Sequence, residues 1–348
     1  MNNKSKIHVV SVGMITSVGE DSKKTAAAIK AGISRYQDSQ CFNKNFNPIK
    51  MSLVDDSALP SLNEELQSLS GLTSRQRRML RLATPALLEV LDALPINNSI
   101  PLFLSGPETL KNCPEAINIK FLEYLVKQTD ANIDLNASRL FATGKAGGIQ
   151  AIDLAFKFFE TTDKDVVLVG GIDSFLDNYL LSFLDNENRI LAENILDGFV
   201  PGEAAGFIML VSDRIISKLS TKQLATLYLP GLASEKGHRY SSMPYKGDGL
   251  SDSFNSAISN GNLQPIESVF SSMNGENFDA KEYGVALMRN TSAFNTNFDH
   301  IHPAENFGDI GAAFGPVLIG LMAQYKTKNA ICYCSSNTEH RSAINVTQ

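Results

Sequence analysis

Cysteine is scarce in this chain, which has four cysteines in 348 residues and none in a Cys-x-x-Cys pair. A disulfide framework needs a denser pattern, so we expect reduced thiols and a cytoplasmic location. Long hydrophobic runs are also missing, because the most apolar stretch, residues 312–323, falls short of the about 20 residues that cross a bilayer. The sequence therefore predicts no membrane span. The start MNNKSKIHVVSVG lacks the small-residue cleavage site of a signal peptide, so we expect it to form a first strand instead.

Excess positive charge is absent too: 31 Lys and Arg face 37 Asp and Glu, which gives a net charge of -6. No overall positive field attracts nucleic acid or anionic membranes, so any basic partner surface must be local. Hydrophobic residues at 43% and charged residues at 20% are ordinary for a folded protein. The length predicts about two domains, or one large fold of two similar halves.

Strand-like and helix-like segments alternate along the whole chain. The expected strands are 7–12, 101–104, 165–169, 206–211, 226–229, 268–271, 330–334 and 343–346. The expected helices are 22–31, 76–94, 119–128, 147–159, 250–259, 280–289 and 311–325. This alternation predicts an α/β architecture with a largely buried sheet, and the polar stretch 213–223 is a candidate junction between two halves.

Residues 196–210, LDGFVPGEAAGFIML, are the most informative stretch. They form a glycine- and proline-containing loop with a carboxylate at Glu203, followed by small residues and an apolar strand. The segment resembles the DGFVxGEGAG motif of β-ketoacyl synthases, the condensing enzymes of the thiolase fold, with one alanine in place of glycine.

Four further segments resemble the same family in the same order. They are residues 10–34, residues 142–171 with ATGKAGGIQAI, residues 263–282, and AENFGDIGAAFG at 304–315. The resemblance implies a thiolase-like fold with two related halves, residues 1–212 and 213–348, in an α-β-α-β-α arrangement. It also implies a homodimer formed through the N-terminal halves.

The residues that such an enzyme needs for catalysis are replaced. The family uses a cysteine nucleophile and two histidines, which the resemblance places at Lys145, at Ser271 or Ser272, and at Asp309. A further family lysine falls on Ala304, and the glycine-rich C-terminal loop falls on residues 335–339. We therefore expect these to be vestigial positions with no catalytic residue among them.

The lysine and the aspartate carry a physical prediction of their own. A carboxylate next to an amine favours the charged ammonium, which is a poor nucleophile. Two opposite charges in a pocket that water reaches poorly must pair. We expect Lys145 and Asp309 to lie within about 4 Å or to share one water, with Ser271 or Ser272 adding a hydrogen bond.

Two other motifs have simple structural interpretations. Gly144, Gly147 and Gly148 surround Lys145 without the spacing of a phosphate-binding loop, so a tight turn is expected. His300 and His302 lack a third ligand at a useful spacing, so an ordinary loop is expected rather than a metal site.

The remaining candidates are two cysteines and a group of arginines. Cys332 and Cys334 alternate on an expected strand, which predicts that both are small buried hydrophobic residues. The arginines that open the helix near residue 76 are Arg75, Arg77, Arg78 and Arg81. They would either form a solvated helix face or contact an acidic acyl carrier protein.

The sequence favours a catalytically degenerate ketosynthase-like protein that acts by binding or scaffolding, with no cofactor and no metal. Its candidate partners are a second copy, an active ketosynthase and an acyl carrier protein. The alternative is an acyltransferase or hydrolase of the same superfamily that uses Lys145, Ser271, Ser272, Asp309 or Glu203. A third possibility is a ligand sensor that keeps an acyl tunnel.

Overall fold

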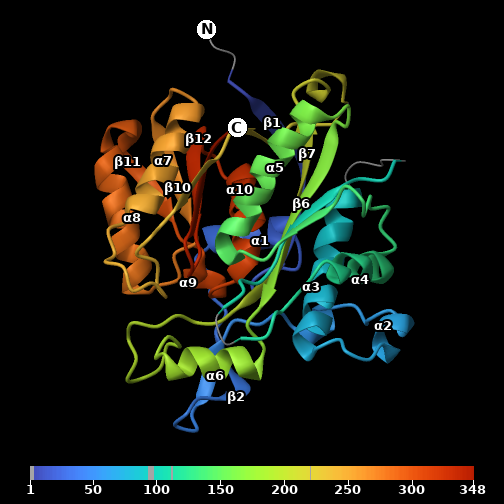
Figure 1. The fold of residues 1–348 in the computed structure, drawn as a ribbon, viewed down its shortest axis with the longest axis vertical. Helices are drawn as coiled ribbons and strands as arrows, with labels where there is room; N and C mark the ends of the chain where they lie inside the picture. Colours follow the sequence, from blue (N-terminus) through green and yellow to red (C-terminus); the bar gives the residue numbers. More distant parts are fainter. Residues whose placement is uncertain (1–3, 93–97, 111–112, 220) are drawn as a thin grey trace.

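The computed structural model describes residues 4–92, 98–110, 113–219 and 221–348, and a large mixed sheet runs through it (Figure 1). Its strands in chain order are β1 (Lys6–Thr16), β4 (Leu102–Ser105), β5 (Arg139–Phe141), β6 (Val166–Ser174), β7 (Glu203–Ser212), β8 (Ala225–Tyr228), β9 (Gly231–Ser234), β10 (Ile266–Ser271), β11 (Phe294–Ile301), β12 (Asn329–Ser335) and β13 (His340–Thr347). A separate hairpin consists of β2 (Gln37–Phe42) and β3 (Pro48–Met51).

The helices are α1 (Ser22–Lys30), α2 (Glu64–Ser68), α3 (Ser74–Asp92), α4 (Lys120–Thr129), α5 (Gly147–Thr161), α6 (Asn178–Asn186), α7 (Asp248–Asn260), α8 (Asn277–Asn290), α9 (Ala304–Phe307) and α10 (Phe314–Gln324). Each expected strand and helix overlaps an observed one, while the last two residues of the expected helix 76–94, and residue 220 of the polar stretch, lie outside the described residues. No helix in the described ranges has the length and apolarity to cross a membrane.

The sheet has two parts that meet at one edge. Its strand order is β11-β10-β12-β13-β8-β1-β7-β6-β4-β5, with β9 on β13. The antiparallel pairing of β1 with β8, from Lys6 with Tyr228 to Val9 with Ala225, joins the parts. The expected layers are confirmed, and this pairing makes the two halves of the sheet continuous. The boundary between residues 212 and 213 stays a prediction.

Hydrophobic cores separate the layers. Helices α5 and α10 lie between the two parts of the sheet and pack with β1, β6, β7, β12 and β13 in the central core (Figure 1). Helices α3 and α4 cover the outer face of the N-terminal part, and α7 and α8 cover the C-terminal part. Strands β1, β4, β7 and β12 are buried on both faces, which explains their continuous apolar sequences.

A smaller core closes the lower end of the molecule. Ile49 and Met51 of β3 pack with Leu180, Leu181 and Leu184 of α6, so the hairpin and α6 form one cap. Figure 1 shows the cap below the ends of the large sheet. The cap lies next to Lys145 and Asp309, because Leu180 and Leu184 of α6 line one pocket with these two residues.

Candidate functional site

Lys145 lies in a tight turn directly before α5. The turn is a short 3-10 helix, Gly144–Ala146, and Gly144 has a φ of +67°, a left-handed conformation that glycine adopts without strain. A Cβ at Gly148 would lie 2.6 Å from Pro316, so the glycine allows α5 to approach α10 closely. The structural interpretation of this glycine group is confirmed.

The Lys145 ammonium forms a buried ion pair with Asp309. Its Nζ lies 2.8 Å from Oδ2 of Asp309 and 3.6 Å from Oδ2 of Asp279, and it donates a hydrogen bond of 3.3 Å to the carbonyl oxygen of Ser272. Burial opposes the charge, but the two carboxylates outweigh it and hold the pKa of Lys145 above its ordinary value. The predicted pair is confirmed, although the serine contributes its backbone carbonyl rather than its hydroxyl.

Asp309 is held in place by groups from three parts of the chain. Its Oδ1 accepts a hydrogen bond of 2.8 Å from the Gly311 amide, and its Oδ2 accepts one of 2.8 Å from Nδ2 of Asn274. Its carbonyl accepts the Gly202 amide at 2.8 Å, which joins the DGFVPGEAAG segment to this loop. The carboxylate therefore has a fixed position beside Lys145.

A second buried ion pair lies beside the first. Arg189 forms a two-point contact with Glu276, at 2.9 Å from Nε to Oε1 and 2.7 Å from Nη2 to Oε2. Burial would raise the pKa of Glu276, yet the hydrogen bonds and charges of Arg189 and Arg239 keep it below its ordinary value. The sequence did not predict this pair, because 87 residues separate its members.

Arg189 lies between two hollows. One is a narrow cavity of about 40 Å³, lined by Lys145, Asp309, Arg75, Glu108 and Arg189 together with apolar cap residues. The other is an open surface hollow of about 540 Å³, lined by residues 187–189, 194–197, 239 and 276. The Arg189–Glu276 pair thus stands at the boundary between the surface cleft and the Lys145 pocket.

The two candidate serines have different surroundings. The Ser272 carbonyl reaches Lys145, and its hydroxyl accepts the Ser335 amide at 3.2 Å. The Ser271 hydroxyl instead lies 2.9 Å from Nε2 of His300. The structure therefore brings Ser272, but not the Ser271 hydroxyl, to the Lys145–Asp309 pair.

The two histidines do not lie in a loop, as the sequence suggested. His300 is part of β11 and His302 follows directly after it. Strand pairing of β11 with β10 overrides the polar, weakly patterned sequence of this segment. Burial, with His302 nearby, lowers the pKa of His300 to about 4. Across the described ranges, no three His, Cys, Asp or Glu side chains are grouped so that they could hold a metal ion.

Both cysteines of β12 are buried in the central core, so the prediction for Cys332 and Cys334 is confirmed. The interpretation of the arginines as a solvated helix face is wrong, because these side chains are mostly buried and bound to other parts of the chain, while a contact with an acyl carrier protein stays a prediction. Arg75 pairs with Asp173, and Arg78 pairs with Glu203 at 2.6 Å. The other two, Arg77 and Arg81, donate to backbone carbonyls of residues 56–72.

Glu203, a candidate in the alternative function, is fully buried, and both of its carboxylate oxygens have hydrogen-bond partners. Its carboxylate accepts hydrogen bonds from Arg78, from the Ser174 hydroxyl at 2.8 Å and from the Val54 amide at 2.9 Å. These contacts tie β7 to α3 and to the segment after the hairpin. The role of this residue in the structure is to hold elements together.

The loop after β12, residues 336–339, lies at the position of the family's glycine-rich loop. Hydrogen bonds from two sides hold it in place. Glu108 accepts the amides of Asn337 and Thr338 at 3.1 and 2.7 Å. Arg341 donates to the carbonyls of Ser336, Thr338 and His340 at 2.7 to 2.9 Å. The sequence predicted a polar loop here but not these contacts.

Comparisons with known proteins concern the fold of the chain. No family model matches the sequence, and no curated protein sequence does. Among solved structures, the ishigamide ketosynthase/chain length factor has a TM-score of 0.78 and 14% identity, and the match covers 99% of each chain. A type II polyketide synthase acyl-carrier protein in complex with its ketosynthase has a TM-score of 0.75 at 14% identity, with 99% of each chain covered.

A ketosynthase in complex with its chain length factor from Xenorhabdus doucetiae has a TM-score of 0.74 at 14% identity, over 99% of this chain and 98% of that one. Agreement over nearly the whole length shows that the chain has the thiolase-like fold of the ketosynthases. At such low identity the similarity establishes the fold and leaves the function to be argued from the site.

Proposed function

We propose that this protein is a catalytically degenerate ketosynthase-like protein that acts by binding a partner. The observation that carries the proposal is the Lys145–Asp309 ion pair, which occupies the positions where the resemblance places the nucleophilic cysteine and a histidine. A charged ammonium cannot attack a thioester, and a carboxylate cannot stabilise a developing enolate. The loop after β12, which Glu108 and Arg341 hold in place, and the Arg189–Glu276 pair further restrict access to this pocket.

The proposed partners are a second copy, an active ketosynthase or an acyl carrier protein. Similar structures include a ketosynthase with its chain length factor and a carrier protein with its ketosynthase. The four arginines of α3 are engaged inside the protein, so they do not favour the carrier protein. A ketosynthase-like chain is therefore the preferred partner.

The first expected result is an absence of acyl transfer. Incubation with radiolabelled acyl and malonyl carrier proteins should leave the chain unlabelled and release no carbon dioxide, while an intact ketosynthase does both. Position 145 carries an amine held in its charged form by two carboxylates. Stable acylation that is lost in Lys145→Ala would contradict the proposal.

Strand β5 offers a surface for a ketosynthase-like partner. It is the last strand on its side of the sheet and bonds only to β4 in the described part of the chain. Unpaired strand edges pair readily with other chains. Light scattering at micromolar concentration should therefore give about twice the 37.9 kDa chain mass. A monomer that stays monomeric when an intact ketosynthase is added would refute pairing at this edge.

One observation favours the alternative hydrolase function, namely the Ser271–His300 contact of 2.9 Å. Two features oppose it: Ser271 is fully buried, and a histidine with a pKa of about 4 is a weak base at neutral pH. A fluorophosphonate probe distinguishes the two functions, because labelling of Ser271 that His300→Gln abolishes would favour the hydrolase.

A further inference from the structure

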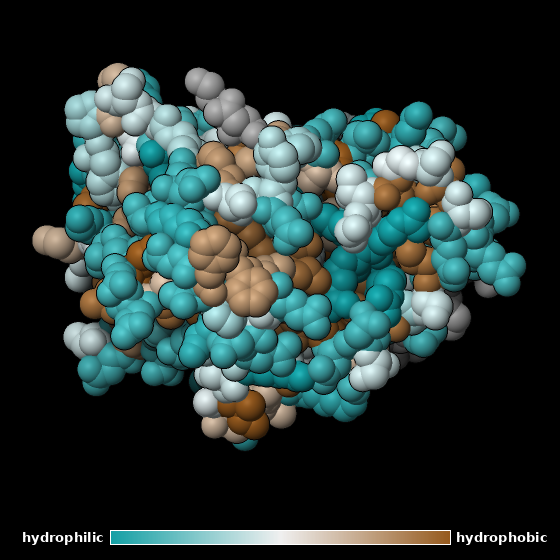
Figure 2. All heavy atoms as spheres, turned by 90° about the horizontal axis from the view of Figure 1, so that it is seen from below, coloured by the Kyte–Doolittle hydropathy of each residue, from teal (hydrophilic) through white to brown (hydrophobic). Residues whose placement is uncertain are grey.

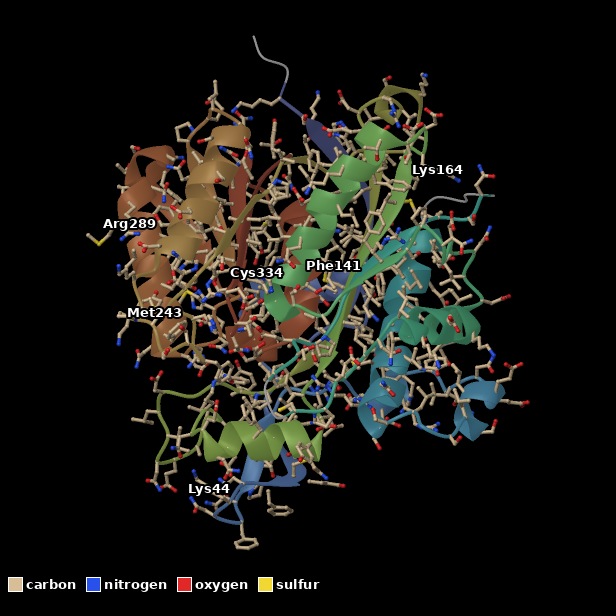
Figure 3. All side chains as sticks on the ribbon, in the orientation of Figure 1. Lys44, Phe141, Lys164, Met243, Arg289 and Cys334 are labelled. Carbon is tan, nitrogen blue, oxygen red and sulfur yellow. The ribbon has the colours of Figure 1, made fainter. Side chains whose placement is uncertain are left out.

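The β2–β3 hairpin exposes two phenylalanine rings at one end of the molecule. Phe42 is 61% exposed and Phe46 is 87% exposed. Figure 1 shows the hairpin as the lowest part of the fold, and Figure 3 places Lys44 at this same end. Figure 2, which views this end, shows a small apolar group near the middle of the face among hydrophilic side chains. The tip is convex and cannot bury these rings within the chain.

The turn holds Phe46 in an unfavourable backbone conformation. Its φ of +60° lies in the left-handed region, where a phenylalanine is strained and where glycine or asparagine is preferred. Asn43 fixes the turn, because its Oδ1 accepts the amides of Asn45 and Asn47 at 3.0 and 2.9 Å. Neither the backbone nor the core benefits from an exposed ring here, so its presence points to a contact outside the chain.

The tip also carries positive charge in an otherwise acidic protein. Residues 41–50, CFNKNFNPIK, contain two lysines and no acidic residue, while Asp38 lies opposite Lys50 in the hairpin and Asp185 accepts the Lys44 amide. The Lys44 ammonium binds two neutral oxygens, the Asp185 carbonyl at 3.0 Å and Oδ1 of Asn188 at 2.6 Å. Neither Lys44 nor Lys50 lies within ion-pair distance of a carboxylate among the described residues.

The hairpin is rigidly attached to the body. Below the tip, Ile49 and Met51 are buried against α6, and the Lys44 amide donates to Oδ2 of Asp185 at 2.6 Å. The aromatic rings therefore project from a fixed support rather than from a loose loop. A rigid support means that little conformational entropy is lost when the tip binds.

We propose that this hairpin tip docks the protein on an anionic lipid surface, with Phe42 and Phe46 in the interfacial layer and Lys44 and Lys50 at the headgroups. Exposed aromatic rings beside lysines are the chemistry of interfacial membrane contacts. Phenylalanine is common in protein–protein interfaces as well, but lysine is depleted at the centres of those interfaces, so the lysines beside the two rings favour the lipid surface. Because the whole chain has a net charge of -6, this local attraction rather than an overall positive field would orient the protein on the bilayer.

Co-sedimentation with vesicles tests the proposal directly. The full chain should bind vesicles of phosphatidylcholine with about one third phosphatidylglycerol, bind pure phosphatidylcholine more weakly, and dissociate as salt rises. The double variant Phe42→Ser/Phe46→Asn should lose about tenfold or more in binding. Asparagine suits the left-handed position, so this variant should remain folded. The control Leu263→Asn removes another highly exposed apolar side chain, 88% exposed, and should bind as the parent does.

A fluorescence probe provides an independent measurement. The chain has no tryptophan, so Phe46→Trp introduces a single indole at the tip. Its emission should shift to the blue with the anionic vesicles, and that of Leu263→Trp should not. The proposal is overturned if the parent does not bind these vesicles, if the double variant binds them equally, or if Phe46→Trp shows no shift. A tip that instead mediates contact with a protein would give the first of these results.

Discussion

Replacing Lys145 with methionine is expected to lower the free energy of unfolding by about 3 to 5 kcal/mol, because it leaves two buried carboxylates without their shared cation. Asp309 and Asp279 both depend on this ammonium, at 2.8 and 3.6 Å. Methionine fills a similar volume, so the loss reports charge rather than a cavity. Urea unfolding followed by circular dichroism measures it.

Two further variants separate the ion pair from general damage. Lys157→Met, on the exposed face of helix α5 that follows Lys145, removes a lysine paired with Asp153 and should change stability by less than about 1 kcal/mol. The double variant Lys145→Met/Asp309→Asn removes one charge of each sign and should recover part of the loss. If Lys145→Met were as stable as the parent, the ammonium would have to point to solvent, and its chemistry would need to be reconsidered.

The positions at this site were predictable because motifs mark them. The segment DGFVPGEAAG fixes the start of β7, and the pattern around Gly308 and Gly311 fixes Asp309. A lysine and an aspartate assigned to one pocket then have to pair, since neither charge is tolerated alone. The same reasoning fails for Asp279, whose contact with Lys145 depends on where α8 begins.

Other parts depend on contacts that no local pattern encodes. The arginines of α3 look like a basic patch in the sequence, yet their partners are Asp173, Glu203 and backbone carbonyls brought close by folding. Strand β5 has three residues and β11 has a polar sequence, so neither has a strand periodicity to detect. Pairing with β4 and β10 makes them strands.

Replacing Arg341 with methionine is expected to cost about 3 to 5 kcal/mol of unfolding free energy and to release the loop after β12. Arg341 and Glu282 are both fully buried, with 2.6 Å between Nε and Oε1. The variant leaves Glu282 unpaired and the three loop carbonyls without a donor. Hydrogen exchange of amides 336–340 should accelerate. The control Arg289→Met breaks an exposed pair on α8, the helix that carries Glu282, and should not affect these amides.

The pH dependence of this loss identifies its cause. Burial raises the pKa of Glu282 even when Arg341 is present, and removing the cation raises it further. The Glu282 carboxyl of the folded variant then has a higher pKa than it has in the unfolded chain, so the folded state binds its proton more tightly. The variant is therefore least destabilised at acidic pH. It loses stability as the pH rises through the pKa that Glu282 has in the folded state. The difference between Arg341→Met and the parent should therefore be smaller at pH about 5 than at pH about 8. If the loss of unfolding free energy is the same at both pH values, the lost loop hydrogen bonds alone cause it, since their donors and acceptors do not titrate in this range.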